Sequence, residues 1–165
     1  MPTRLTTARP TTARIEDGIL GPYIVSPADP FVERMEEEDD SFDRLVLAAR
    51  ALRRDPGCIE AHLPLSECSP DDATRLKHLE LAVATGDQLF KPVAERYGDD
   101  MCWWGYPGTR PYMCAIHALA LARLEMGDAA AAKRGFKRLL RMNPYDNQGA
   151  RFGLESLETA AAPRI

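Results

Sequence analysis

The sequence contains few features of a membrane protein, a secreted protein or an enzyme. None of its apolar runs approaches the roughly 20 residues that a membrane-spanning helix needs, and Met1 to Leu20 lacks the apolar stretch of a secretory signal. We therefore expect a cytoplasmic protein without a membrane anchor. A Gly-rich phosphate loop, a nucleophile elbow and a helical His-Glu-x-x-His motif are also missing. These absences predict no catalytic residues, no metal and no cofactor, so we expect no enzyme.

Cysteine is scarce, and its four copies are widely spaced, at Cys58, Cys68, Cys102 and Cys114. Without an export signal this spacing favours reduced thiols over disulfides. We expect the four side chains to serve as small packing residues.

Charge is present in both signs but is unevenly distributed along the 165 residues. Residues 1–100 carry 20 acidic and 12 basic side chains, a net charge of −8, whereas residues 101–165 carry 5 and 9, a net charge of +4. Such asymmetry can steer one subunit onto another, and a mixed solvated surface produces it equally well. A homo-oligomer is therefore one alternative, and the acidic total disfavours nucleic acid as a partner.

The chain has the length of one domain, with a change of character near residue 40. Residues 1–40 are expected to form a tail and an acidic linker, partly disordered or docked, because the first 30 hold five prolines and no sustained period. The acidic run after Phe31 suits either a helix N-terminus or a solvated linker. Residues 41–160 are expected to form the folded domain.

Apolar residues recur at helical spacing through this second part. The first helix should end before Asp55-Pro56-Gly57, and a second apolar segment follows from Ile59. Ser69 is expected to cap a long third helix with a kink at Pro92. Further helices are expected from Tyr112 to Met126, from Ala129 to Met142 and from about Asn147 to Thr159. No stretch alternates apolar and polar residues, so the sequence predicts an all-α fold.

The last helix pair has the spacing of a helical repeat of about 34 residues. We number the repeat from Met113 as its first position. The diagnostic positions 7, 8, 20, 24 and 32 are then occupied by Leu119, Ala120, Ala132, Phe136 and Pro144. This pattern resembles the tetratricopeptide signature, although Arg123 replaces an aromatic or leucine and Leu139 replaces an alanine.

The wider sequence, over about residues 41–158, resembles uncharacterised bacterial tetratricopeptide-like proteins and the helical-repeat core of the suppressor-of-tumorigenicity family. The segments that carry this resemblance are residues 56–62, 81–87 and 143–151. The resemblance implies a short stack of antiparallel helix hairpins, a right-handed solenoid with a C-terminal capping helix. It implies no activity, and we expect a module that binds a protein or peptide partner.

The loop before the fourth helix is the most unusual segment and the first candidate site. Its aromatic residues and arginine, which are types enriched at interfaces, are Trp103, Trp104, Tyr106, Arg110 and Tyr112. They can line a binding surface, or they can fill space between hairpins, with Trp103 inside and Trp104 outside.

The repeat register places Cys114, His117 and Leu121 toward the concave groove. In the family, basic and amide side chains at such positions clamp a C-terminal carboxylate, so these residues predict apolar anchors instead. Lys133, Lys137 and Arg141, flanked by Arg134 and Arg138, form a basic stripe that suits an acidic partner or is simply a solvated face.

Two further sets of residues have a structural and a functional reading. Four residues are of types that bind zinc: Cys58, His62, Cys114 and His117. Together they would suit a metal-dependent or hydrolytic enzyme. Their spacing matches no compact zinc motif, however, and favours a role in packing. The polar set from Asn143 to Arg151 can bind a peptide backbone or an anion, and Asp146 or Asn147 as a helix cap explains most of it.

Overall fold

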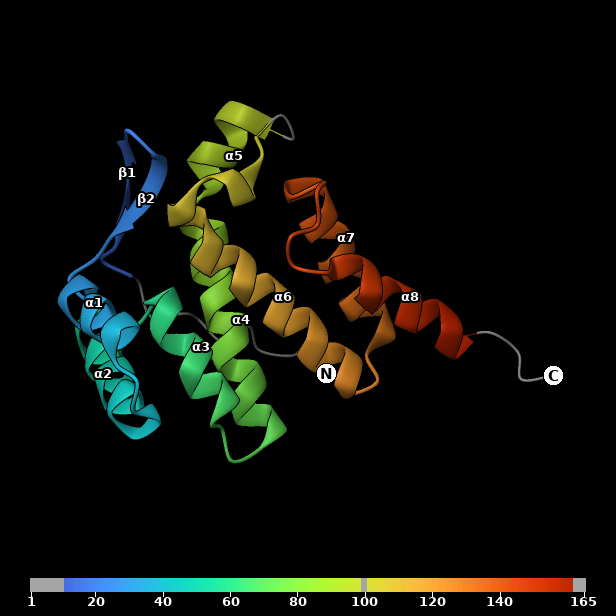
Figure 1. Ribbon diagram of the computed structural model, residues 1–165, viewed down its shortest axis with the longest axis horizontal. Coiled ribbons are helices and arrows are strands. Elements are labelled where there is room, and N and C mark those ends of the chain that lie inside the picture. Colours follow the sequence, from blue (N-terminus) through green and yellow to red (C-terminus); the bar gives the residue numbers. More distant parts are fainter. Residues whose placement is uncertain (1–10, 99–100, 162–165) are drawn as a thin grey trace, which may run out of the picture.

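A computed structural model describes residues 11–98 and 101–161, so Met1 to Pro10 of the expected tail lie outside the described residues. The described chain is mostly helical, with one two-stranded sheet (Figure 1). The elements are β1 (Arg14–Gly18), β2 (Gly21–Val25), α1 (Asp29–Glu37), α2 (Ser41–Arg54), α3 (Ile59–Glu67), α4 (Asp72–Leu89), α5 (Lys91–Tyr97), the 3-10 turns η2 (Trp103–Gly105) and η3 (Pro107–Thr109), α6 (Arg110–Glu125), α7 (Ala129–Met142) and α8 (Ala150–Ala161). Among the described residues, no helix combines the length and apolar character that crossing a bilayer requires.

Two hydrophobic cores hold the helices together. The smaller core joins α1, α2 and α3 through residues such as Met35, Leu47 and Ala61. The larger core joins α3, α4, α5, α6 and α7 and is built around Leu79, Met113 and other buried side chains. Figure 1 shows α1 and α2 at one end of the molecule and α8 at the other, with α4 and α6 between them.

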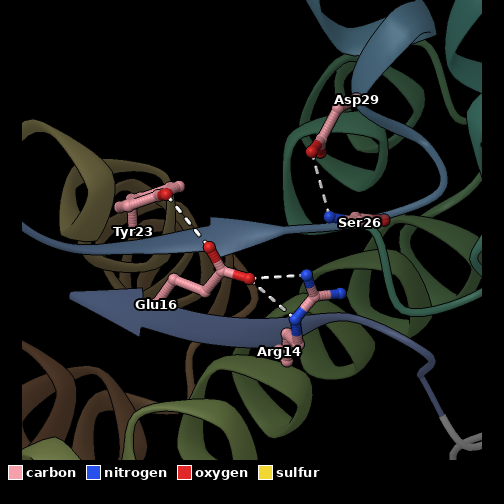
Figure 2. A network of polar contacts seen from close by, with 5 residues as sticks. All are labelled: Arg14, Glu16, Tyr23, Ser26 and Asp29. Carbon is pink, nitrogen blue, oxygen red and sulfur yellow. Dashed lines mark hydrogen bonds and ion pairs between the residues drawn. The ribbon is translucent and has the colours of Figure 1, made fainter. Parts of the chain in front are cut away.

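The antiparallel hairpin of β1 and β2 was not predicted from the sequence. Ile15 pairs with Ile24, and both pack against the larger core, whereas the alternate residues Glu16 and Tyr23 pair on the exposed side. Figure 2 shows Glu16 accepting hydrogen bonds from Arg14 and from the Tyr23 hydroxyl. Both bonds lower the pKa of Glu16, and the bond from Arg14 has the larger effect. The described chain is mostly helical, as predicted, and this hairpin is the exception. Its strands have five residues each, too few for a sustained alternation of apolar and polar residues.

A buried carboxylate attaches the N-terminal segment to the helices. Asp55 follows α2, is fully buried, and accepts hydrogen bonds from the hydroxyls of Ser26 (2.8 Å) and Thr11 (2.9 Å) and from the amide of Gly57 (3.0 Å). The Ser26 amide in turn donates to Asp29 in the first turn of α1 (Figure 2). Residues 11–37 are therefore fixed to the α2–α3 turn by polar contacts as well as by packing.

The acidic run after Phe31 ends at a helix N-terminus, which was one of its two expected roles, whereas the third predicted helix differs in detail from expectation. Asp40 caps α2 by accepting from the amides of Phe42 and Asp43. The cap of α4 is Asp71, which accepts from the Thr74 amide, and not Ser69. At Pro92 the chain does not kink: α4 ends at Leu89, and Pro92 lies in the first turn of the separate helix α5. Proline suits that position because the first helical amides need no partner.

The helices α6 and α7 pack closely against each other through small residues. Gly127 adopts a left-handed backbone conformation (φ 81°) in the turn that follows α6. Asp128 then caps α7 by accepting a hydrogen bond from the Ala131 amide. Ala132 and Phe136 are fully buried. A Cβ atom added to Gly135 would lie 2.7 Å from the Cβ of Ala120, so the two helices approach as closely as small residues allow. The predicted helix from Ala129 to Met142 is confirmed.

Candidate functional site

The aromatic loop before α6 has an inner and an outer half. Trp103 and Tyr112 are buried, at 5% and 2% exposure, and so fill space between the helices. The buried Thr109 hydroxyl donates to the carbonyls of Trp103 and Tyr106 and closes the two 3-10 turns. Because this framework is internal, Trp103 and Tyr112 do not lie on the outer face with the other loop residues.

The outer half of the loop consists of Trp104, Tyr106 and Arg110. The guanidinium of Arg110 lies 5.3 Å from the centre of the half-buried Trp104 ring, and its Nε donates to the Trp104 carbonyl at 3.1 Å. This cation–π contact leaves Arg110 exposed yet held in one place. The ring of Tyr106 packs directly on Gly21 of β2, where any side chain would overlap that ring. The loop is therefore in contact with the hairpin.

The three residues of α6 that were expected to face a groove, Cys114, His117 and Leu121, are all half-buried. The thiol of Cys114 lies 3.9 Å from the Gln148 amide, and the ring of His117 meets the edge of Phe136 with centroids 6.1 Å apart. Leu121 packs against the margin of the larger core. Burial raises the pKa of Cys114 and lowers that of His117, so at neutral pH the thiol is protonated and the imidazole is uncharged. The face of α6 that carries Cys114, His117 and Leu121 is therefore only weakly polar, which suits contact with apolar side chains of a partner.

The turn between α7 and α8 borders this face and holds unpaired polar atoms. Asp146 adopts a left-handed conformation (φ 55°) and accepts from the amides of Ala150 and Arg151, which confirms it as a helix cap. Both amide atoms of the buried Asn143 and the buried carbonyl oxygen of Gln148 have no hydrogen-bond partner among the described residues. The amide nitrogen of Gln148 contacts the thiol of Cys114, so this part of the turn lies beside α6.

The basic stripe lies on the exposed side of α7. Lys133, Lys137 and Arg141 are exposed, whereas Arg138 is half-buried and forms an ion pair with Asp87 at 2.5 Å. Arg138 also donates to the hydroxyl of Tyr112. The stripe therefore has a solvated part and one member that joins α7 to α4 and α6.

The cysteine and histidine set does not form a cluster. Cys58 is buried, whereas His62 bonds to His78 and to the Pro56 carbonyl, far in sequence from Cys114 and His117 on α6. Among the described residues, no three His, Cys, Asp or Glu side chains gather closely enough to hold a metal ion. Cys68 and Cys102 are exposed, so the expectation that all four cysteines serve packing was wrong for these two.

Sequence reasoning missed two partners in these networks. His78 of α4 contacts the ring of His62 of α3. Asp87 accepts hydrogen bonds from the Tyr112 hydroxyl and from the Arg138 guanidinium. A helix-spacing argument cannot pair residues of different helices. Gly86 instead lies inside α4, where an added Cβ would overlap the Tyr112 ring, so it makes room for that side chain.

Comparison of the chain with family models, with curated proteins and with solved structures yields no match.

Proposed function

We propose that this chain is a protein-interaction module that binds a protein or peptide through the outer half of the aromatic loop and the adjoining face of α6. The tetratricopeptide-like reading of its helix pairs is part of the same proposal. The surface comprises Trp104 and Arg110, followed along one face of α6 by Cys114, His117 and Leu121.

The contact between Arg110 and Trp104 carries the proposal. A partner gains most affinity from a few tryptophan, tyrosine and arginine side chains that are already ordered before binding. Here the stacked pair is held by a hydrogen bond and a cation–π contact, on a loop fixed by Thr109. Arg110 keeps donors free for a carboxylate of the partner.

The face of α6 next to this pair supplies a second, weakly polar part. Its residues are half-buried and uncharged, so a partner can cover them without stripping water from a charge.

The test begins with capture of partners from a native lysate and identification by mass spectrometry. Affinity for the identified partner is then measured with wild type and with Trp104→Ala, Arg110→Ala and the double variant. Each truncation should weaken binding by about 2 kcal/mol while the melting temperature stays nearly unchanged, because both side chains are at the surface. Trp103→Ala is the matched control and should lose fold and binding together.

Two outcomes would contradict the proposal. If the double variant loses helical content along with binding, the outer half of the loop is part of the core. If it keeps both fold and affinity, the binding surface lies elsewhere, and Lys133→Glu with Lys137→Glu then tests the basic stripe.

A further inference from the structure

A pocket of about 320 Å³ is lined by residues of α4, α5, α6 and α7 and by Trp103 of the loop before α6. None of the residues that line it belongs to the surface proposed for a protein partner. Its volume is at the lower end of the range of small-molecule sites. The residues that line it divide into an aromatic wall and a basic rim.

The aromatic wall is made by Phe90, Trp103 and Tyr112. The Phe90 and Tyr112 rings are stacked, with centroids 5.3 Å apart, and Trp103 meets Phe90 edge-on at 5.8 Å. All three side chains are at least 95% buried, so the wall is rigid before any ligand arrives. Two small residues, Ala94 and Gly98, also line the pocket. A flat apolar group can therefore lie against the aromatic wall.

The rim carries three cations and one carboxylate: Lys91, Arg138, Arg141 and Asp87. Asp87 is already compensated, because it pairs with Arg138 and accepts from the Tyr112 hydroxyl at 2.5 Å. Lys91 has only a long, exposed contact of 3.8 Å with Glu95. Within the described chain, Arg141 has no carboxylate within ion-pair distance. Among the described residues that line the pocket, Lys91 and Arg141 are therefore the two cations least compensated by carboxylates.

We propose that this pocket binds a small aromatic anion, with its ring against Phe90, Trp103 and Tyr112 and its charged group between Lys91 and Arg141. A carboxylate and a phosphate monoester share this chemistry, and the test separates them. The Asp87 to Arg138 pair holds the wall and rim together, since it ties α4 to α7 across the Tyr112 hydroxyl. An aromatic cation is disfavoured because the same two charges repel it.

Trp103 provides a direct readout because it forms part of the wall. Trp104→Phe leaves it as the only tryptophan, and its fluorescence is followed during titration with phenylacetate and with phenyl phosphate. At least one of the two should give a saturable change, and the tighter one identifies the anionic group. Benzyl alcohol lacks the charge, acetate and inorganic phosphate lack the ring, and benzylamine reverses the charge. Each should bind at least about tenfold more weakly.

Variants then place the site. Arg141→Gln and Lys91→Gln should each weaken the aromatic anion several-fold, and Ala94→Phe should abolish binding by filling the pocket. Lys133→Gln is the matched control, because it removes one positive charge from the same helix away from the pocket. Its affinity should equal that of the parent protein. A circular dichroism melt confirms that each variant is folded.

Four results would overturn the proposal. If neither aromatic anion saturates up to about 10 mM, which corresponds to a binding free energy weaker than about 3 kcal/mol, the pocket is not a site for them. If benzyl alcohol binds as tightly as the aromatic anions, the charge plays no part, and if acetate or inorganic phosphate does so, the ring plays no part. If Lys133→Gln reduces the affinity as much as Arg141→Gln, the effect is general electrostatic attraction.

Discussion

The Nδ1 atoms of His62 and His78 lie 2.9 Å apart, across the interface of α3 and α4. The Nε2 atom of His62 lies 3.0 Å from the Pro56 carbonyl, which can only accept, so Nε2 carries the proton. The Nδ1 atom of His62 is then the acceptor, and His78 donates to it. A second proton on His62 would turn its Nδ1 atom into a donor, and His78 could then accept only in its other tautomer, so the arrangement described here belongs to the neutral form of His62.

Stability should therefore fall in mild acid. Burial lowers the pKa of His62 from 6.5 to about 4, so between these values the unfolded chain binds more protons than the folded one. The free energy of unfolding should drop as the pH falls from 6.5 to 4, by about 3 kcal/mol at most, and level off below. Urea denaturation at several pH values measures this slope.

The control is His62→Gln, which can donate to Pro56 and accept from His78 without titrating. Carboxylates also titrate in this range, so the comparison is the difference between the two curves. The variant should have a clearly flatter slope. Parallel curves would mean that His62 is protonated alike in the folded and unfolded states.

Phe136→Ala should destabilise the protein by about 3–5 kcal/mol, because it leaves a cavity between α6, α7 and α8. The ring is fully buried, meets His117, and lies so close to Gly153 that no side chain fits there. Chemical denaturation measures the loss. Phe152→Ala, at a ring that is 73% exposed, should change stability by less than about 0.5 kcal/mol. A shift of one or two degrees in the Phe136 variant would show that the predicted repeat register is incorrect.

Gly86→Ala should destabilise the protein, although alanine is the better helix former by about 1 kcal/mol. The added methyl group would overlap the Tyr112 ring and displace its hydroxyl from Asp87. Overpacking of this kind costs about 1–3 kcal/mol. In a Tyr112→Leu background the overlap is relieved, so Gly86→Ala should become neutral or stabilising there. Equal effects in both backgrounds would place the cost elsewhere in α4.

Asp55→Ala should release the N-terminal segment. It leaves the buried Ser26 hydroxyl and the Gly57 amide without their acceptor, at a cost of about 1–3 kcal/mol for each. Hydrogen exchange should rise first in β1, β2 and α1, while α6 and α7 keep their protection. Ser26→Ala removes one donor and should have a smaller effect in the same region. Uniform loss of protection would show that residues 11–37 unfold only with the whole domain.

Self-association through the uneven charge would depend on salt. If the acidic first part of one chain docks on the basic second part of another, association should weaken as the Debye length falls from about 10 Å at 0.1 M salt to 3 Å at 1 M. Sedimentation at both concentrations measures the mass. A monomer at both, or a mass that does not change, would exclude this mode.

The sequence by itself determined the helices whose signals are local. The apolar spacing and the small residues Ala120 and Ala132 are read within one helix pair, and the expected bounds of α7 are those observed. The strands of the hairpin were missed because five residues give little periodicity, and because the pairing of Ile15 with Ile24 depends on the core beneath them. Local patterns cannot reveal that support.

Only the tertiary structure decided how the candidate sites are divided. Composition marked Trp103 to Tyr112 as unusual, but burial separates Trp103 and Tyr112 from Trp104 and Arg110. The pocket beside Phe90 combines residues from four separate segments, and no spacing rule connects Asp87 with Arg138. Helical periodicity reports which face of a helix is buried. Which other helix buries it, and which charges are left without a partner, follows from packing over long sequence distances.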